Sequence, residues 1–407
     1  MDVREIVDQK SFEAWLEALP EERRYEWAVT LATRAALRVF PFWGAAMLRD
    51  MARRRNWTVL PICRNVLISA VAVKIRTANI RRAADTSVDA ADAAITVEPS
   101  IGSGGGTTDD ALSAASAAIF TAEAATDTGV AVDAALAIGN ADLLRWAVLR
   151  ADILELEQGF DLRTLPLWSE DMPADIAEAW EKGRAWMEAA PGHAFWIRWY
   201  EAILAGRPLT QDWDSHWQLM HDIALVPDED WGEGKEQDAI GVARIIDLIT
   251  QKHALQQEVA RAKRALENET YNAMTLGQHS HNLPDDLPPS RVVQYRRHLR
   301  EVQEELEAVE AALQPPIPDA ALLEEVTGRL SAAWERLKVT ARAIGVGVVA
   351  GVTIYVSAAI GQAGVRGMDW LLDHGMPQLI RGLKDTAPKP STPPKASKGW
   401  ERPSVDT

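Results

Sequence analysis

The sequence predicts a mainly α-helical protein, built from a helical body, an antiparallel coiled-coil hairpin and a C-terminal glycine-rich apolar helix. Three observations support this fold class. Apolar residues recur every three or four positions near the N-terminus, a heptad pattern runs through residues 241–344, and an uncharged run of 23 residues, 343–365, follows it.

Composition places the chain among folded proteins. Its 407 residues, 47% hydrophobic and 25% charged, allow two or three domains with their own cores. The single cysteine, Cys63, excludes an internal disulfide framework and any zinc site with two or more thiolates. Its apolar neighbours favour a buried, inert thiol over a nucleophile. The N-terminus is polar and lacks the apolar core of a signal peptide, which predicts a cytoplasmic body.

Residues 1–84 are expected to form a basic helical segment in an acidic protein. They carry fifteen Lys or Arg against nine Asp or Glu, whereas the whole chain has a net charge of -16. Between Arg34 and Arg82, eleven bases accompany a single acid, Asp50. Such a segment can bind nucleic acid, anionic lipid or a protein partner, or it can neutralise the protein's own acidic half. The candidate basic patch consists of Arg53, Arg54 and Arg55.

Two helices are expected within this segment. In the first, apolar side chains repeat every four residues along one face, and we expect Pro41 to end it. The second is expected from about Cys63 to Ala84, with an apolar part too short to span a bilayer. The apolar stripe of the first helix consists of Trp27, Leu31, Ala35 and Val39.

Residues 85–145 are rich in Ala, Asp, Thr and Ser, with a glycine-rich loop near the middle. Four glycines precede Thr107, as in a phosphate-binding loop. A loop of the Walker type needs a Lys after its last Gly, but Asp109 and Asp110 follow here and would repel phosphate. We therefore expect a flexible loop and no nucleotide cofactor.

Residues 146–235 hold nine of the sixteen Trp residues and are expected to form a Trp-rich helical domain, with Gly206 at a helix C-terminus. His216 and His221 are five residues apart, so a helix would not bring both to one face for a metal. Aromatic residues spaced three and four apart share one helix face. They either bind a partner or ligand or fill the core, and helix packing favours the core. The candidate interaction residues are Trp196, Trp199, Tyr200 and Trp231.

Residues 236–342 carry the most regular pattern and are predicted to form a coiled-coil, three-helix unit. Heptad spacing runs along three stretches and is broken at Lys252. Proline-rich joints at 277–289 and 314–319 separate the stretches, which predicts an antiparallel hairpin extended by a third helix. The second and third series are Val292, Tyr295, Leu299, Val302, Leu306, Val309 and Leu313, then Leu323, Val326, Leu330, Ala333, Leu337, Thr340 and Ile344.

The uncharged run at 343–365 is a candidate transmembrane helix, with a buried soluble helix as the alternative. At helical rise it spans about 35 Å, enough for a hydrocarbon core of about 30 Å. Gly347 and Gly351 form a G-x-x-x-G face suited to helix pairing. Basic residues flank the run on both sides and weakly favour a cytoplasmic N-terminal side. An amphipathic segment, 366–385, and a disordered tail, 386–407, follow, and with a cytoplasmic body this short tail is expected to be exported.

The stretches "WLEALPEERRYEWAVTLATRAALRVFP", "FWIRWYEAILAGRP", "IALVPDEDWGEGKE" and "GQHSHNLPDDLPP" carry a wider resemblance. They resemble blocks of the form W-Y-x-x-x-L-x-G, A-L-[IV]-P-D-x-x-W and G-x-G-H-N in a loose group of uncharacterised bacterial Ala/Trp-rich helical proteins. Gln278 and Ser280 depart from the last pattern. The resemblance implies a bacterial, mostly helical protein and no particular chemistry.

The sequence predicts no catalytic, cofactor-binding or metal-ligating residues. The favoured hypothesis is a membrane-tethered interaction protein, an effector or sensor at the bacterial inner membrane, which self-associates or binds a protein partner and contacts anionic lipid. A cytoplasmic location is the alternative. A hydrolase-like enzyme, with a site formed only in the fold near the Trp-rich segment, and nucleic-acid binding through Arg34–Arg82 are the competing functions. A deep pocket with several carboxylates or histidines would favour the enzyme.

Overall fold

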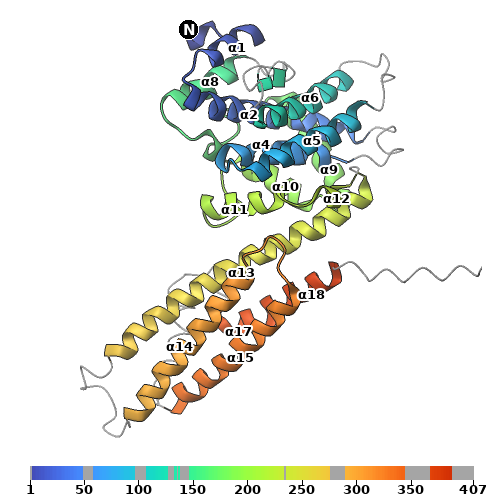
Figure 1. Cartoon of the computed structure of the whole chain (residues 1–407). Helices are drawn as coiled ribbons and strands as arrows, with labels where there is room; N and C mark the ends of the chain where they lie inside the picture. Colours follow the sequence, from blue (N-terminus) through green and yellow to red (C-terminus); the bar gives the residue numbers. More distant parts are fainter. Residues whose placement is uncertain are drawn as a thin grey trace, which may run out of the picture. The chain divides into compact units, whose positions relative to one another are not determined.

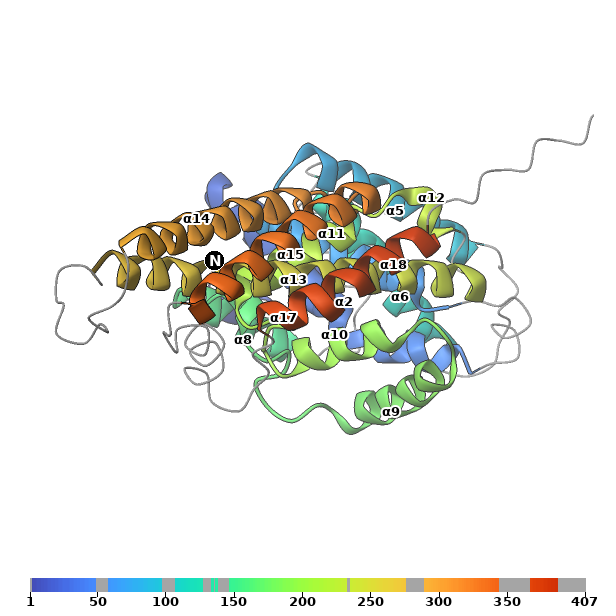
Figure 2. The same cartoon turned by 90° about the horizontal axis from the view of Figure 1, so that it is seen from below.

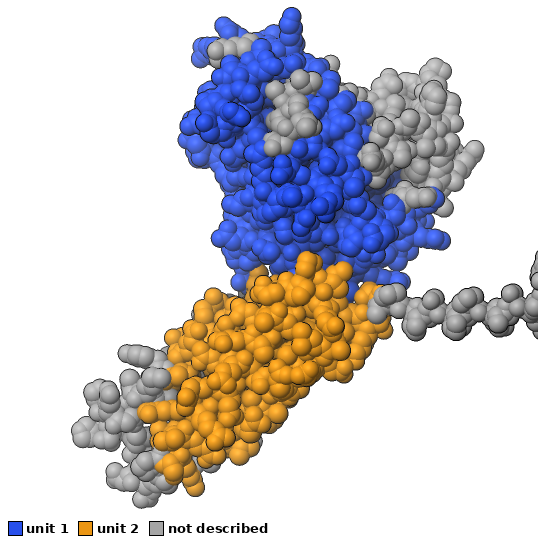
Figure 3. Space-filling view, viewed as in Figure 1, with its two compact units in different colours: residues 1–254 blue, residues 255–407 orange. Residues whose placement is uncertain are grey.

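The structure is a computed structural model of the chain, and it describes residues 2–48, 58–96, 107–126, 133–134, 136–137, 146–232, 235–275, 289–343 and 367–386. The regular elements in these ranges are helices, which confirms the mainly α fold (Figure 1). The chain divides into two compact units, residues 1–254 and 255–407 (Figure 3). Each unit has its own hydrophobic core, and the long helix α13 (Glu236–Thr275) contributes to both.

Unit 1 is built around one long helix, α2 (Glu21–Ala46), which is buried along most of its length. It packs against α4, α6 and α9 on different sides, so few of its side chains reach solvent (Figures 1 and 2). The other elements of the unit are η1 (Val3–Glu5), α1 (Gln9–Glu17), α4 (Leu60–Lys74), α5 (Ala78–Thr96), α6 (Thr107–Ala125), α8 (Trp146–Glu157), η2 (Leu162–Thr164), α9 (Ala174–Ala189), α10 (Ala194–Leu204), α11 (Trp213–Ala224) and α12 (Asp228–Trp231).

The prediction that Pro41 ends the first helix is wrong, because α2 continues past it to Ala46. Proline lacks an N–H, so Pro41 cannot donate a hydrogen bond to the carbonyl of Leu37, four residues earlier. The hydroxyl of Tyr200 in α10 donates to that carbonyl instead, at 3.1 Å. A side chain distant in sequence thus supplies the hydrogen bond that the proline removes.

The single helix predicted from about Cys63 to Ala84 is also wrong, because the structure has two helices there, α4 and α5. The break falls at residues 75–77. The hydroxyl of Thr77 accepts a hydrogen bond from the backbone N–H of Ile80 at 3.3 Å, as an N-terminal cap does. A Thr that satisfies a free N–H favours a new helix start over a continuous helix. Cys63 is buried, as expected, and burial raises the pKa of its thiol.

Two glycines let α2 and α9 cross in close contact. An added Cβ at Gly183 in α9 would lie 3.0 Å from the carbonyl carbon of Gly44 in α2. An added Cβ at Gly44 would lie 3.3 Å from the Cα of Gly183. The backbones therefore touch where neither helix carries a side chain, which is a crossing that larger residues would push apart.

Unit 2 is an antiparallel set of helices formed by the second half of α13, α14 (Pro289–Ala312), α15 (Ala320–Ala343) and a final helix. Side-chain contacts fix the directions. Tyr295 near the start of α14 donates to Glu269 near the end of α13, and His298 contacts Thr340 near the end of α15. The final helix consists of α17 (Met368–Trp370), one π-helical turn η3 (Leu371–Gly375) and α18 (Met376–Thr386).

The predicted heptad faces are confirmed from Tyr295 to Leu313 along α14 and from Leu323 to Thr340 in α15, because these residues are buried in unit 2. Val292 is half-buried, and Ile344 lies outside the described residues. Leu299, Leu306 and Leu330 are each 0% exposed. The predicted three-helix unit gains a fourth member, since the segment expected to be amphipathic packs on α15 with Met376, Leu379 and other apolar residues buried. An added Cβ at Gly375 would lie 2.6 Å from the side chain of Leu255 in α13, so this last helix approaches α13 as well.

Several predicted features lie outside the residues that the structure describes. They are the basic patch Arg53, Arg54 and Arg55, the glycine-rich loop before Thr107, the joint between α13 and α14, most of the run 343–365 with Gly347 and Gly351, and the tail after Thr386. In the described part of the chain, the helices are all too short or too polar to cross a membrane.

Candidate functional site

The predicted aromatic residues come together in the core of unit 1. Trp196, Trp199, Tyr200 and Trp231 are at most 2% exposed. The ring of Trp196 lies 5.6 Å from that of Trp199 and 6.1 Å from that of Trp231, measured between ring centroids. These residues therefore fill space between helices, and they do not offer a surface to a partner.

Three arginines of the basic segment are also buried. Arg34 and Arg38 in α2 pair with Asp152 in α8, and Arg64 in α4 pairs with Asp228 in α12. These three charges neutralise carboxylates of the same chain, as one of the interpretations of the segment expected, and cannot reach a nucleic acid. The bases of the segment that remain exposed on α4, α5 and the link between them are Lys74, Arg76, Arg81 and Arg82.

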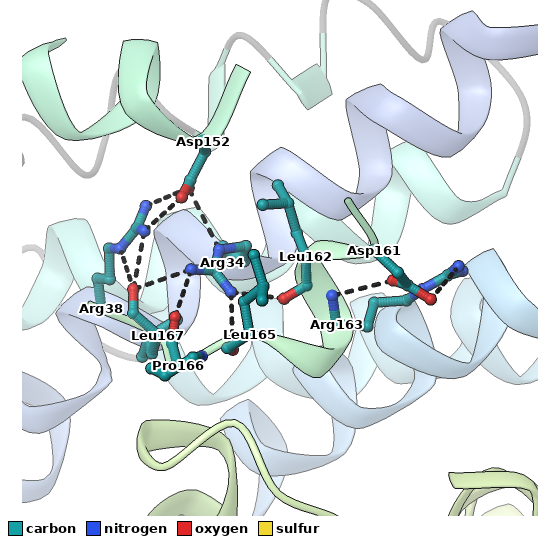
Figure 4. A network of polar contacts seen from close by, with 9 residues as sticks. All are labelled: Arg34, Arg38, Asp152, Asp161, Leu162, Arg163, Leu165, Pro166 and Leu167. Carbon is teal, nitrogen blue, oxygen red and sulfur yellow. Dashed lines mark hydrogen bonds and ion pairs between the residues drawn. The ribbon is translucent and has the colours of Figure 1, made fainter. Parts of the chain in front are cut away.

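Arg34 and Arg38 hold the chain segment that follows η2 (Figure 4). Arg34 donates to the carbonyls of Leu162 at 2.7 Å and Pro166 at 2.8 Å, and both arginines donate to the carbonyl of Leu167. Burial lowers the pKa of Arg34, and the nearby Asp152 counteracts this in part. The two guanidinium groups share the single carboxylate of Asp152, so their remaining N–H groups donate to backbone carbonyls. These hydrogen bonds fix the segment 162–167 against α2.

The end of α10 locks onto the same segment. Gly206 has a φ of +58° and closes α10 with two hydrogen bonds, from its own N–H to Ile203 and from the N–H of Arg207 to Ala202. This is the Schellman arrangement that a glycine favours, as the sequence predicted for Gly206. A Cβ at Gly206 would lie 2.4 Å from the nitrogen of Pro166, so only glycine allows this contact.

A cavity of about 60 Å³ lies between α2, α4, α10, α11 and this fixed segment. Arg207, placed by the turn at Gly206, lines it and is exposed, so this guanidinium lies at the mouth. Its other polar groups come from Thr30, Thr33, His216 and the already paired Arg34 and Arg163. The apolar wall consists of Leu37, Leu67, Trp199, Trp213, Trp217 and Met220.

His216 lines this cavity as a neutral imidazole. Its Nδ1 accepts a hydrogen bond from the backbone N–H of Leu209 at 3.2 Å, so the proton of the neutral ring belongs on Nε2. Burial lowers the pKa of His216 to about 4. The rings of Trp213 and Trp217 contact it edge-on, with centroids 5.3 Å and 5.0 Å away. At neutral pH the cavity wall is therefore uncharged next to these indoles.

Two polar groups of the cavity have no role in the fold. The hydroxyl of Thr33 is buried and has no hydrogen-bond partner among the described residues. The guanidinium of Arg207 makes no ion pair or hydrogen bond with that part of the chain, whereas Arg163 nearby is paired with Asp161 and Glu26. A buried hydroxyl without a hydrogen-bond partner destabilises a fold by about 1–3 kcal/mol. A ligand that hydrogen-bonds to Thr33 would remove this penalty.

Sequence reasoning missed Thr33 and Arg207, and considered His216 only with His221 as a metal pair. The structure separates the two histidines, since His221 contacts Asp222 outside this cavity. The cavity lining holds one histidine and no carboxylate. A general acid and base in one cleft, which would have favoured an enzyme, are not brought together here.

A second buried polar cluster explains the break in the first heptad series. Lys252 is 0% exposed and donates to Asp222 in α11, while Nε2 of His253 lies 2.9 Å from the same carboxylate. Burial opposes ionisation of Asp222, but hydrogen bonds from His221, His253 and Lys252 outweigh it and hold the pKa of Asp222 well below its usual range. The described residues offer no group of His, Cys, Asp or Glu that could hold a metal ion, so this cluster is an ion pair that joins α11 to α13.

One end of unit 2 gathers a different set of features. Because the helices alternate in direction, α13 and α15 end there, and α14 and α17 begin there. Asp369, at the start of the last helix, accepts hydrogen bonds from Trp334 at 2.9 Å and Lys338 at 3.2 Å. Lys384, near its end, contacts Glu324 at the start of α15. The last helix thus runs back along α15.

Exposed apolar and basic residues also lie near this end. Val293 in the first turns of α14 is 64% exposed, and Val339 near the end of α15 is 63% exposed. The first half of α14, residues 289–300, contains no Asp or Glu. Its bases are Arg291, Arg296, Arg297 and Arg300.

Comparison of the chain with models of known protein families, with curated proteins and with solved structures finds no match. The features that bear on function are therefore those of the fold itself, the cavity of unit 1 and the end of unit 2.

Proposed function

We propose that the protein is a membrane-tethered interaction protein without a catalytic centre, whose unit 2 contacts the membrane with the end where α15 stops and α17 starts. One observation carries the proposal: the last helix returns along α15. The described residues that flank the uncharged run, Ala343 at the end of α15 and Gly367 before α17, therefore lie towards the same end of unit 2.

The return of the chain limits how the run can enter a membrane. Residues 344–367 separate α15 from α17, so each arm of a path out and back has about 12 residues, or about 18 Å at helical rise. A hydrocarbon core is about 30 Å thick. We therefore propose that the run enters one leaflet and returns to the same side. This replaces the expected exported tail, since residues 367–386 belong to unit 2.

Charge and exposure at this end support membrane contact. The first half of α14 carries four arginines, of which Arg297 pairs with Glu301 in the next turn. A base near an anionic surface contributes about 1 kcal/mol. Val293 and Val339, exposed at the same end, suit the boundary between headgroups and acyl chains.

The competing functions have less support. An enzyme near the Trp-rich segment needs a cleft with several ionisable groups of complementary roles. The cavity beside Trp199 offers a single neutral histidine beside arginines. A larger hollow of about 640 Å³ nearby is lined by Glu170, Asp171 and Asp175 and by no histidine or cysteine. Nucleic-acid binding through Arg34–Arg82 could not use the three arginines that are buried against carboxylates.

Location and sidedness can be measured together in bacterial cells. The full chain with Cys63→Ser and Ser391→Cys is expressed, membranes are washed with carbonate, and cells are labelled with an impermeant thiol reagent before or after lysis. We expect the protein in the washed membranes and labelling only after lysis, because the tail returns to the cytoplasmic side. Val349→Lys, within the uncharged run, should release the protein to the soluble fraction, and its matched control Val349→Leu should not.

Each contrary outcome removes one part of the proposal. Labelling of intact cells would show an exported tail and contradict the return to the same side. Protein that washes off the membrane in carbonate, or that stays bound despite Val349→Lys, would contradict insertion of the run.

A further inference from the structure

The hollow of about 640 Å³ in unit 1 lies between one face of α8 and the segment that leads into α9. Its volume is within the range of about 300–1,000 Å³ that holds a drug-sized ligand. The side that α8 forms is apolar and consists of Ala147, Val148 and Ala151, which are all at least partly exposed. Leu154, about one turn after Ala151, lies on the same helix face and is 47% exposed. This face of α8 is therefore an exposed apolar strip that borders the hollow.

The other side of the hollow is acidic. Glu170, Asp171 and Asp175 line it and are exposed, and their carboxylates make no ion pair or hydrogen bond with the described part of the chain. The described residues that line the hollow include no Lys, Arg or His. Asp175 has a role in the fold, because it lies in the first turn of α9, where the helix dipole favours an acid. Glu170 and Asp171 precede that helix, so their charges are left for a ligand.

The backbone that carries these carboxylates is held at both ends. At one end, Arg38 donates to the carbonyl of Leu167 at 2.8 Å (Figure 4), and its guanidinium lies 5.4 Å from the ring centroid of Trp168. At the other end, the carbonyl of Pro173 accepts a hydrogen bond from the N–H of Ala177 at 2.8 Å. A surface that is ordered before it binds loses less conformational entropy on binding. The hollow can therefore bind without rearrangement of the fold.

The positions of the charges determine the kind of ligand. The described residues offer no group of three or more His, Cys, Asp or Glu that could hold a metal ion, so these carboxylates do not converge on one point. A single small cation would contact them one at a time, whereas bases spaced along a chain can contact several together. The apolar strip of α8 favours an apolar group between those bases.

We propose that the hollow docks a basic peptide segment of a partner protein, with Lys or Arg side chains on the carboxylates and an apolar side chain on the strip of α8. This goes beyond membrane tethering, because it names the class of partner that unit 1 binds. Complementary charges give specificity and fast association more than affinity, and exposed pairs are screened by salt. We therefore expect weak binding that decreases further as the salt concentration rises.

Calorimetric titration of the full chain tests this with three hexapeptides of two alternating residues: Lys and Leu, Lys and Ser, and Glu and Leu. We expect saturable binding of the Lys/Leu peptide, with a dissociation constant below about 200 μM in about 0.15 M salt. The Lys/Ser peptide has the charges without the apolar groups and should bind at least about fivefold more weakly. The Glu/Leu peptide should not bind.

Two variants that lose the same number of charges test the position of the site. Glu170→Gln with Asp171→Asn should weaken binding of the Lys/Leu peptide by about fivefold or more, since each exposed ion pair contributes modestly. The control, Glu157→Gln with Glu181→Gln, removes two exposed carboxylates of α8 and α9 that do not line the hollow. It should leave the affinity within about twofold of that of the unmodified protein.

Ala151→Gln tests the apolar strip, because it puts a long polar side chain there and keeps a residue that favours a helix. The ratio of the affinities of the Lys/Leu and Lys/Ser peptides should fall to about two or less. A general loss of space in the hollow affects both peptides and cancels in this ratio. A melting temperature close to that of the unmodified protein shows that the variant is folded.

Four results would overturn the proposal. They are no saturable binding of the Lys/Leu peptide, equal binding of the Lys/Ser peptide, an affinity that Glu170→Gln with Asp171→Asn does not change, and equal losses in both charge variants. Spermidine is the remaining probe. If it displaced the Lys/Leu peptide at an equal concentration, the hollow would bind a polyamine and not a peptide. None of these results bears on membrane insertion, which depends on unit 2.

Discussion

Tyr200 shows how one hydroxyl can decide the course of a helix. It is fully buried beside Phe40 and Trp180, and the sequence predicts it only as one aromatic residue of a helix face. Its hydrogen bond to the carbonyl of Leu37 compensates for Pro41, which has no N–H to give. The aromatic ring fills the core, and the hydroxyl keeps α2 continuous.

Tyr200→Phe should therefore destabilise the protein by about 1–3 kcal/mol, because a buried carbonyl would lose its donor. Urea unfolding measures this cost. In a Pro41→Ala background the same substitution should cost less, since residue 41 then has an N–H for Leu37. An equal cost in both backgrounds would contradict the role given to the hydroxyl.

His216 makes stability depend on pH over a defined window. Its pKa is about 4 in the folded protein and about 6.5 in an unfolded chain. Above pH 6.5 both states are neutral. As pH falls from 6.5 to 4, the unfolded state binds a proton and the folded state does not, so the free energy of unfolding decreases, by at most about 3 kcal/mol.

The substitution His216→Asn should remove this part of the pH dependence, because Asn keeps an acceptor for the N–H of Leu209 but does not titrate. Thermal unfolding between pH 7 and pH 4 measures the difference from the unmodified protein. His374→Asn, at an exposed position of unit 2, serves as the control and should leave the slope unchanged. Equal slopes for all three proteins would mean that the pKa of His216 is the same in the folded and unfolded states, and would contradict its lowering by burial.

At the scale of elements, the crossing of α2 and α9 depends on the absence of two side chains. Gly183→Ala should destabilise unit 1 by about 1–3 kcal/mol, since its Cβ would lie 3.0 Å from backbone atoms of Gly44 that cannot move aside. Gly241→Ala in α13 is the matched control. No atom lies within 4 Å of its added Cβ, so this substitution should stabilise the helix by about 0.5–1 kcal/mol.

Urea midpoints of the two variants, with unchanged slopes, would separate these effects. Gly241→Ala should raise the urea midpoint. If Gly183→Ala raised it too, α2 and α9 could not be in close contact at Gly44 and Gly183.

The elements also show what could be predicted from sequence. The heptads of α14 and α15 were readable because the pattern repeats locally and every contact it implies joins neighbouring helices. The extension of α2 past Pro41 was not, because the donor that permits it comes from Tyr200. The division between α4 and α5 rests on one capping hydroxyl, which apolar periodicity does not reveal.

At the scale of the whole molecule, the same distinction separates the candidate sites. Thr33, Arg207 and His216 come from three helices or their ends, and none belongs to a local motif, so only the fold unites them at one cavity. The aromatic stripe was visible in sequence, but its burial follows from the helices that surround it. The packing of the last helix along α15 could not be predicted from sequence either, because it depends on long-range contacts such as that of Trp334 with Asp369.

The bond between Tyr200 and Leu37 also has a consequence for synthesis of the chain on the ribosome. The two residues are 163 positions apart. At about 5–20 residues per second, the carbonyl of Leu37 waits roughly 8–33 s before its donor has been translated. During that interval the middle of α2 has an unpaired acceptor beside a proline, so the nascent helix is weakest there. Completion of α2 is therefore set by the arrival of α10, and not by the synthesis of α2 itself.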